Sequence, residues 1–262
     1  MGSGDKLTVT LENRVTRITF NRPERRNAVD FEAMQQLHDA IQQAARDDTR
    51  VIVLTGAGDA FCAGADLQAR TPEQIKSYDV TAGLRKHTTP AILAMSRMPK
   101  PIIARVHGPA AGIGFSYALA ADIRIASDQA KFSMGFIKIG LMPDGGSTHF
   151  LPRLVGYSRA FELMATGVTI DASQALALGL VNQVVPVEKL DSAVNALVET
   201  FLAAPAIALG KIKEALAYSQ SADLGSALEF EALNQADCFR SEDFLEGVNA
   251  FLQKRKASFQ GR

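Results

Sequence analysis

One acidic side chain stands in the glycine-rich segment Gly140–Thr148. Pro143 restricts the backbone directly before Asp144, while Gly145 and Gly146 permit backbone conformations that other residues rarely adopt. A stiff turn of this kind could aim the Asp144 carboxyl at a reacting atom as a proton acceptor. The same residue types also suit a turn or a helix cap, so this segment alone leaves both interpretations open.

Two further turns are rich in small residues, Ala63–Asp66 and Gly112–Gly114, and each follows a strand-like segment. Small residues let main-chain N–H groups approach a ligand, and a donor at the start of a helix near Phe115 gains from the helix dipole. Two such donors could form an oxyanion hole, which stabilises charge that develops on a carbonyl oxygen. Tight helix–strand packing is the alternative reason for these glycines. A lone GxG is weak support for a nucleotide site.

The composition is that of a globular protein with room for a buried site. The chain has 262 residues, 47% of them hydrophobic, and its 28 basic and 28 acidic side chains cancel. That balance argues against a nucleic-acid-binding surface over the whole molecule. The longest apolar stretches are broken well before bilayer length, and the first residues show no signal pattern, so we expect a cytoplasmic protein with no membrane partner.

Cysteine and histidine spacing predicts no metal site. Cys62 and Cys238 form no CxxC pair, so ordinary buried thiols are expected. The four histidines have no metal-ligand spacing.

The elements that must carry these turns can be predicted from periodicity. Leu7–Leu11 and Val15–Phe20 alternate apolar and polar residues and predict a hairpin. Val51–Gly56 is a continuous apolar run that predicts a strand buried on both faces, and Pro101–Val106 predicts another. Further predicted elements are a helix capped by Asp30, a helical region from Gln74 to Met98 interrupted near Thr88–Pro90, and a strand over Leu180–Val185. The repeated strand-turn-helix order indicates an α/β core.

The chain after Leu151 becomes mostly helical. We predict one domain over residues 1–262, with an α/β core over about 5–200 and a helical region over about 201–262 that serves assembly. Helices are predicted over Leu190–Ala203, Ala206–Tyr218, Leu224–Arg240 and Ser241–Arg255.

Several motifs together resemble the crotonase, or enoyl-CoA hydratase/isomerase, superfamily, and the resemblance covers nearly the whole chain. They are Asn21-Arg22-Pro23 with Asn27-Ala28, Phe61–Leu67, Gly108–Asp122, Gly140–Thr148, Ala172–Val185 and Phe251–Lys256. The resemblance implies a core of repeated ββα units, a helical C-terminal part that builds trimers or dimers of trimers, and an acyl-CoA thioester as substrate. Coenzyme A is then part of the substrate, and no separate cofactor is implied.

The resemblance also implies site residues. The oxyanion hole maps onto the main-chain N–H groups of Ala65 and Ile113, where Ile113 replaces a glycine usual in relatives but keeps the donor. Substrate contacts carry over to Arg22, Arg25, Arg26, Ala28, Ala63, Asp66, Leu67, Gly112, Ser116, Phe136, Pro143 and Lys213, and to Lys256 and Phe259 from a neighbouring subunit. Arg25 or Arg26 would reach phosphate. Each lysine could equally be a solvated surface charge.

The matching positions favour isomerisation over hydration. Where related hydratases carry two glutamates, this chain has Ser116 and Phe136, whereas Asp144 matches the aspartate of related isomerases, most closely those that act on ring-epoxide phenylacetyl-CoA. One base suffices to move a proton along a conjugated system. We therefore expect an acyl-CoA isomerase that moves a double bond or opens a ring epoxide.

Two alternative functions and the role of one histidine stay open at this point. One is a hydratase with a non-standard acid/base set, and another is a non-catalytic relative that binds acyl-CoA or RNA. His149 could be a second acid/base group or a packed side chain.

Overall fold

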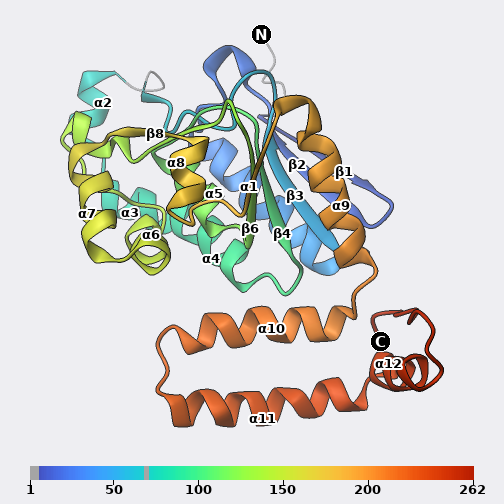
Figure 1. Cartoon of the computed structure of the whole chain (residues 1–262). Coiled ribbons are helices and arrows are strands. Elements are labelled where there is room, and N and C mark those ends of the chain that lie inside the picture. The colour runs from blue at the N-terminus through green and yellow to red at the C-terminus, as the bar shows by residue number, and fades with distance from the viewer. Residues whose placement is uncertain (1–5, 68–70) are drawn as a thin grey trace.

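The computed structural model describes residues 6–67 and 71–262, and Figure 1 shows a mixed α/β core with a group of helices below it. Six strands form the main sheet in the order β1-β2-β3-β4-β6-β9. Their bounds are Leu7–Glu12 (β1), Val15–Phe20 (β2), Val51–Gly56 (β3), Ile102–Val106 (β4), Ile123–Ser127 (β6) and Gln183–Val185 (β9). β1 and β2 pair antiparallel, which confirms the predicted hairpin, and the later pairs are parallel.

A second, small sheet has the order β5-β7-β8, with bounds Ala110–Ala111, Lys131–Ser133 and Thr169–Asp171. The helices are Phe31–Arg46 (α1), Pro72–Lys76 (α2), Val80–Gly83 (α3), Thr89–Arg97 (α4), Ile113–Ala120 (α5), Ser147–Val155 (α6), Tyr157–Thr166 (α7), Ala172–Ala177 (α8), Leu190–Leu202 (α9), Ala206–Ser219 (α10), Leu224–Arg240 (α11) and Glu242–Leu252 (α12). Short helical turns cover Pro23–Arg25 (η1), Leu84–Thr88 (η3, a π-helix), Gly135–Ile139 (η4) and Val187–Lys189 (η5).

The centre of the main sheet is covered on both faces, as the apolar run of β3 predicts. Ile52 and Leu54 pack into the larger core together with residues of α1, α4 and α5. Val51 and Val53 point to the other face, where Leu190, Val194 and Val198 of α9 cover them. Side chains alternate between the faces of a strand, so a strand buried on both faces must be apolar throughout.

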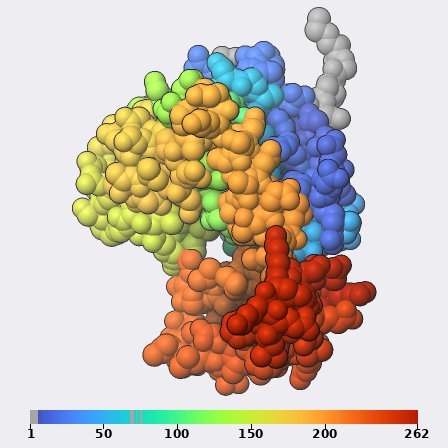
Figure 2. Space-filling view, turned by 45° about the vertical axis from the view of Figure 1, so that its right-hand side comes forward, coloured from blue at the N-terminus to red at the C-terminus, as the bar shows by residue number. Residues whose placement is uncertain are grey.

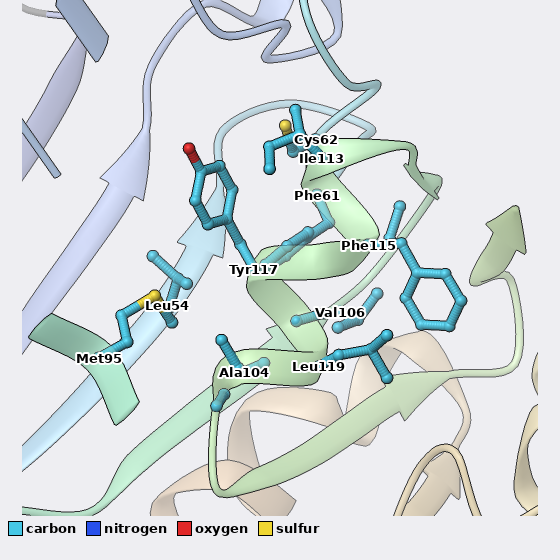
Figure 3. Packing of buried hydrophobic residues seen from close by; sticks show 14 of the residues in the cluster. Leu54, Phe61, Cys62, Met95, Ala104, Val106, Ile113, Phe115, Tyr117 and Leu119 are labelled. Carbon is cyan, nitrogen blue, oxygen red and sulfur yellow. The ribbon is translucent and has the colours of Figure 1, made fainter. Parts of the chain in front are cut away.

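Helix α5 lies inside the molecule, and its eight residues are all buried. Figure 3 shows its side chains surrounded by those of Leu54, Met95 and Val106 from neighbouring elements. A helix that is apolar on all sides can be stable only where protein covers every side. The start of α5 is therefore held in place by the core, which matters because Ile113 begins it.

The predicted interruption of the helical region near Thr88–Pro90 is wrong. The break lies at Ser77–Asp79, where the Asp79 side chain caps α3 by accepting the Ala82 N–H. From Val80 to Arg97 the chain stays helical through the π turn η3. Pro90 directly follows this π turn, so the local departure from α geometry accompanies the residue that lacks an N–H donor, and the helical stretch continues through it.

Two other boundaries differ from prediction. Of the strand expected over Leu180–Val185, only Gln183–Val185 (β9) forms a strand. The last helix ends at Leu252 instead of Arg255.

The helices after α9 form a lobe beneath the core, shown in orange and red in Figures 1 and 2. The ammonium of Lys213 in α10 lies 2.7 Å from Asp122 Oδ2 of the core, and the Arg50 guanidinium donates to the carbonyl of Ala204 at 2.7 Å. α11 buries none of its residues. Among the described residues, no single helix has the length and apolarity to cross a bilayer; Val187–Leu202 and Ala206–Ser219 would do so only as a pair, bent by 106°.

Candidate functional site

The two glycine-containing turns lie side by side. The N–H groups of Phe61 and Cys62 donate to the carbonyl of Pro109 at 3.0 and 3.1 Å, and Ala111 N–H donates to the carbonyl of Cys62 at 2.9 Å. Gly64 has φ of +109°, and a Cβ there would stand 3.1 Å from the carbonyl oxygen of Ala111. A glycine at this position therefore permits both the backbone conformation and the close approach of the second turn.

The N–H groups of Ala65 and Ile113 are left available by the local backbone. Val29 N–H donates to the Gly64 carbonyl and Asp66 N–H donates to the Val29 carbonyl, both at 2.8 Å. This parallel bridge uses the groups on either side of Ala65, so the N–H of Ala65 itself points away from Val29. Ile113 is the first residue of α5, where the helix supplies no acceptor.

Both residues line one cavity of about 600 Å³. Within residues 6–67 and 71–262, neither N–H has an acceptor from the protein. These two donors are thus suited to bind an oxygen that enters the cavity.

The third turn brings Asp144 to the same cavity. Gly145 follows it with φ of +62°, and a Cβ there would overlap Ile113 Cδ1 at 2.2 Å and Ser116 Cβ at 2.9 Å. Only glycine therefore lets this turn approach the start of α5 so closely. The carbonyl of Asp144 is held by Ser116 Oγ at 3.0 Å, Ser147 Oγ at 2.8 Å and Ser147 N–H at 3.2 Å.

The carboxyl of Asp144 differs from its own main-chain carbonyl, because it accepts no hydrogen bond from the described residues. Burial in the cavity disfavours its charged form and raises its pKa to about 6. A carboxyl with such a pKa can both accept and return a proton near neutral pH.

The remaining carboxylates of the cavity are engaged elsewhere. Asp66 pairs with Arg22 at 2.9 Å, and Asp30 caps α1 and accepts from Lys6 at 2.6 Å. Glu32 also pairs with Lys6. Asp144 is consequently the carboxyl on this wall that is available for proton transfer.

Most of the cavity wall is apolar. Besides Ile113, the apolar residues that line it include Val29, Phe31, Met34, Leu67, Val80, Leu84, Phe136, Ile139 and Leu141. Of the residues predicted from sequence to touch substrate, Ala63, Asp66, Leu67, Gly112 and Phe136 line this cavity together with the two proposed oxyanion donors. Ser116, which donates to the Asp144 carbonyl, and Pro143, which directly precedes Asp144, do not line the cavity.

Arg22 is tied to the protein instead of reaching into the cavity. Its guanidinium donates to the Ala28 carbonyl and to Asp66, both at 2.9 Å, and its N–H donates to Asn27 Oδ1 at 2.9 Å. These contacts fasten the loop before α1 to the turn that carries Ala65. Arg25 and Arg26 in the same loop are exposed and remain the residues suited to meet a phosphate.

The residues predicted near the C-terminus lie outside this cavity. Lys213 pairs with Asp122 under α10, so the structure does not support the prediction that it contacts substrate within this chain. Lys256 is exposed, and the ring of Phe259 packs beside Gly247 of α12. Their predicted contact with substrate would be made from a neighbouring subunit.

His149 does not line the cavity. It lies on α6, and its ring meets that of Phe150 edge to face at 5.3 Å between centroids. Burial and the Arg153 charge lower the pKa of His149, and a hydrogen bond that the protonated ring donates to Gln220 opposes this shift. Within the described ranges, no three His, Cys, Asp or Glu side chains gather as a metal site would require.

One part of the wall was missed from the sequence. Phe31 of α1 stacks on Tyr78 and on His87 of η3, at 5.4 and 4.4 Å between centroids. Leu84 and Thr88 of the same π turn line the cavity. The Asp79 cap could have indicated a helix start at Val80, but the apolar pattern of the region does not reveal a π turn.

The sequence and the mixed α/β fold of this chain have counterparts among known proteins. The enoyl-CoA hydratase/isomerase family profile matches residues 10–262. A 1,2-epoxyphenylacetyl-CoA isomerase of Escherichia coli K12 is 40% identical over 254 residues, which cover 96% of this chain and 97% of that protein. A crotonyl-CoA hydratase of Syntrophomonas wolfei is 34% identical over 258 residues, which cover 97% and 98% of the two chains.

The fold comparison agrees. A crystal structure of an enoyl-CoA hydratase from Mycobacterium smegmatis is 34% identical, has a TM-score of 0.92 and covers 98% of this chain and 99% of that chain. The chain therefore belongs to the enoyl-CoA hydratase/isomerase family and has the crotonase fold expected from its motifs. Its activity lies within the acyl-CoA hydratase and isomerase reactions of that family.

Proposed function

We propose that the protein is an acyl-CoA isomerase that moves a double bond, or opens a ring epoxide, with Asp144 as its single proton shuttle. The observation that carries this proposal is the carboxyl of Asp144, raised in pKa to about 6 and free of hydrogen bonds from the described residues, beside the free N–H groups of Ala65 and Ile113. Proton acceptor and oxyanion donors are the two components that enolate chemistry requires.

The reaction conserves every atom of the substrate. The thioester carbonyl oxygen accepts hydrogen bonds from Ala65 and Ile113. Asp144 removes a proton from a carbon of the acyl group, and the electron pair of that C–H bond moves toward the carbonyl oxygen as a dienolate. The electrons then return from the oxygen, and the acid form of Asp144 gives the proton to another carbon of the conjugated system. Loss of one oxyanion donor typically costs about 2.7–4 kcal/mol of barrier.

Hydration is the second candidate, since one relative named above is a crotonyl-CoA hydratase. Adding water requires a base for the water and an acid for the neighbouring carbon. The other carboxylates of the cavity wall are held in ion pairs or a helix cap, which favours a one-carboxyl reaction.

Further proposals concern the rest of the substrate and the assembly. Coenzyme A would lie against Ala28, Ala63, Asp66 and Leu67, with its phosphates near Arg25 and Arg26, and no separate cofactor takes part. The C-terminal helices would assemble a homotrimer or a dimer of trimers, in which Lys256 and Phe259 contact coenzyme A bound by the adjacent subunit.

The cavity favours an uncharged acyl group. Its wall is mainly apolar, and its ionisable groups within the described residues are Tyr78 and the acids Asp30, Glu32, Asp66 and Asp144. A second carboxylate on the substrate would meet like charge and lose its hydration. Between two enoyl-CoAs of equal length, the methyl-ended one should have kcat/KM at least about 10-fold above the carboxylate-ended one. Equal values would contradict this part of the proposal.

A panel of enoyl-CoAs tests the reaction type. Each compound is incubated with the protein and followed by mass spectrometry and by ultraviolet absorbance of the conjugated thioester. Isomerisation changes the absorbance at constant mass, hydration adds the mass of one water, and a binding protein changes neither. Mass gain across the panel, or no change at all, would overturn the isomerase proposal.

A further inference from the structure

The main-chain carbonyl of Asp144 accepts three hydrogen bonds. It accepts from Ser116 Oγ at 3.0 Å, from Ser147 Oγ at 2.8 Å and from Ser147 N–H at 3.2 Å. Ser116 comes from α5 and Ser147 from the start of α6, and both are 0% exposed. A turn residue on the surface needs no such set of donors, because water serves its carbonyl.

The two hydroxyls act on the direction of the carboxyl. The carbonyl and the side chain of Asp144 share one Cα, so fixing the peptide after Asp144 fixes the direction of the Cα–Cβ bond and with it the side of the turn on which the carboxyl lies. The carboxyl accepts no hydrogen bond from the described residues that could hold it there directly. Its placement therefore depends on the backbone to which it is attached.

Ser116 also connects the acid to the oxyanion turn. Its Oγ lies 3.3 Å from the carbonyl of Gly112, whose neighbour Ile113 supplies one of the free N–H groups. Because a hydroxyl carries one proton, the shorter contact with Asp144 is the stronger one. The same side chain thus lies between the two groups that must act on one substrate.

We propose that Ser116 and Ser147 are positioning residues, which hold the Asp144 carboxyl inside the apolar cavity through the Asp144 carbonyl. This inference rests on the proposed function of Asp144 and assigns neither serine a contact with substrate. Without these hydroxyls, the turn would relax and the carboxyl would reach water.

Several other ionisable groups face the same cavity and must be considered in a pH experiment. Asp30, Glu32, Asp66 and Tyr78 line it, and the buried Tyr117 hydroxyl of α5 interacts electrostatically with Asp144. None of them contributes to the raised pKa of Asp144, which burial alone causes. A change in solvent access to Asp144 should therefore appear directly in its titration.

The test compares Ser116→Ala and Ser147→Ala with Ser127→Ala. Ser127 is also 0% exposed, and its hydroxyl donates to the carbonyl of His107 at 2.7 Å, at the end of β6 and away from Asp144. The pH profile of kcat/KM, kcat and KM are measured for the isomerisation of an enoyl-CoA. Thermal melts establish that each variant is folded. If one of the two serine variants does not fold, the other alone is compared with Ser127→Ala.

We expect Ser116→Ala and Ser147→Ala each to lower kcat by about 2- to 10-fold, the effect of one hydrogen bond, with little change in KM. The midpoint of the pH profile should move down from about 6, since a more hydrated carboxyl ionises more easily. Ser127→Ala should keep the wild-type midpoint. If the three variants share one midpoint with the wild type, the positioning role is wrong.

The variant Asp144→Asn distinguishes failure of the positioning role from failure of the proposed isomerase function. If Asp144→Asn keeps full isomerase activity, the proposed function itself fails. If it is inactive while Ser116→Ala and Ser147→Ala behave like Ser127→Ala, only the positioning role fails.

Discussion

The carboxyl of Asp144 must meet two opposing requirements. It must be ionised to accept a proton from carbon, yet it lies in a cavity that disfavours its charge. A pKa of about 6 is a compromise between these demands, because the base is largely ionised at neutral pH while its conjugate acid is still able to return the proton. The same raised pKa that suits Asp144 to proton transfer therefore also lowers the stability of the folded protein at neutral pH.

The pH profile of the wild-type enzyme follows from this titration. In the free enzyme, kcat/KM should rise with pH through a midpoint at about 6 and stay level above it, because only the ionised carboxyl accepts a proton. Asp144→Asn should lower kcat/KM by about 10²- to 10⁴-fold at neutral pH. Steady-state rates across the pH range measure both effects. A profile that is flat from pH 5 to pH 8 would count against Asp144 as the base.

Asp144→Asn should also stabilise the fold at neutral pH. The pKa of Asp144 is raised from 3.8 to about 6 on folding, so its contribution to stability is fully present below about pH 4 and is lost as pH rises through about 6. Asparagine avoids the buried charge. After allowance for partial exposure, we expect a gain of about 1–2 kcal/mol in the free energy of unfolding near pH 7.5.

Urea unfolding at a fixed protein concentration measures this difference. At pH 4 the two proteins should unfold with nearly equal free energy, which serves as the internal control. Intact mass must be checked, because Asn followed by Gly145 is prone to revert to aspartate by deamidation. A variant less stable than wild type near pH 7.5 would show that the native environment does not penalise the Asp144 charge.

The turn that carries Asp144 depends on the space beside α5. A Cβ on Gly145 would overlap Ile113 and Ser116, whereas one on Gly140, whose φ is also positive at +74°, meets nothing within 4 Å. Gly140→Ala should thus cost only the conformational strain, about 1–2 kcal/mol. Gly145→Ala adds a steric displacement of the acid and should lower kcat by about 10- to 100-fold.

Comparison of Gly140→Ala with Gly145→Ala separates the effect of backbone strain from that of displacing Asp144. Unfolding free energies and kcat are measured for both variants and the wild type. Gly140→Ala should keep kcat within about 2-fold of wild type, because its strain lies at the far end of the segment. Equal losses of kcat in the two variants would mean that the close approach to α5 is unimportant.

The elements that can be predicted from sequence are those whose pattern is local. Alternation predicts the hairpin, the apolar run predicts β3, and the Asp30 cap predicts the start of α1, since the Asp30 side chain does accept the Ala33 N–H. The region between Gln74 and Met98 could not be predicted in the same way. Pro90 is a helix breaker in most contexts, but here the π turn η3 lies directly before α4 and the helical stretch continues through the proline.

Parts of the site that depend on contacts between residues far apart in the chain could not be predicted from local sequence patterns. The sequence indicates that Asp144, Ala65 and Ile113 carry chemistry, and the structure brings all three to one cavity. It does not indicate that Ser116 turns its hydroxyl to a carbonyl 28 residues away, or that Lys213 pairs with an acid 91 residues away. The family resemblance makes Lys213 a candidate for contact with coenzyme A, and only the structure reveals that its ammonium pairs with Asp122.

The molecule as a whole exposes much apolar surface on its C-terminal lobe. α11 buries none of its residues, and Leu224, Leu228, Leu233 and Phe239 on it are 54–75% exposed. The lobe is fastened to the core by few polar contacts, chiefly those of Lys213 and Arg50. A surface of this kind is more typical of a subunit interface than of a face left in water.

Assembly through the lobe can be tested by placing a charge on it. The wild type should elute with a mass of three or six times 28.1 kDa in size-exclusion chromatography with light scattering. Leu233→Asp introduces a carboxylate on the exposed face of α11 and should shift the mass toward that of one chain, because the charge would have to be buried between subunits. Leu176→Asp on α8 is the control, since Leu176 is a 44% exposed leucine of the core surface. It should leave the mass unchanged. A wild type that elutes as one chain, or a Leu233→Asp variant that assembles as the wild type does, would contradict assembly through this lobe.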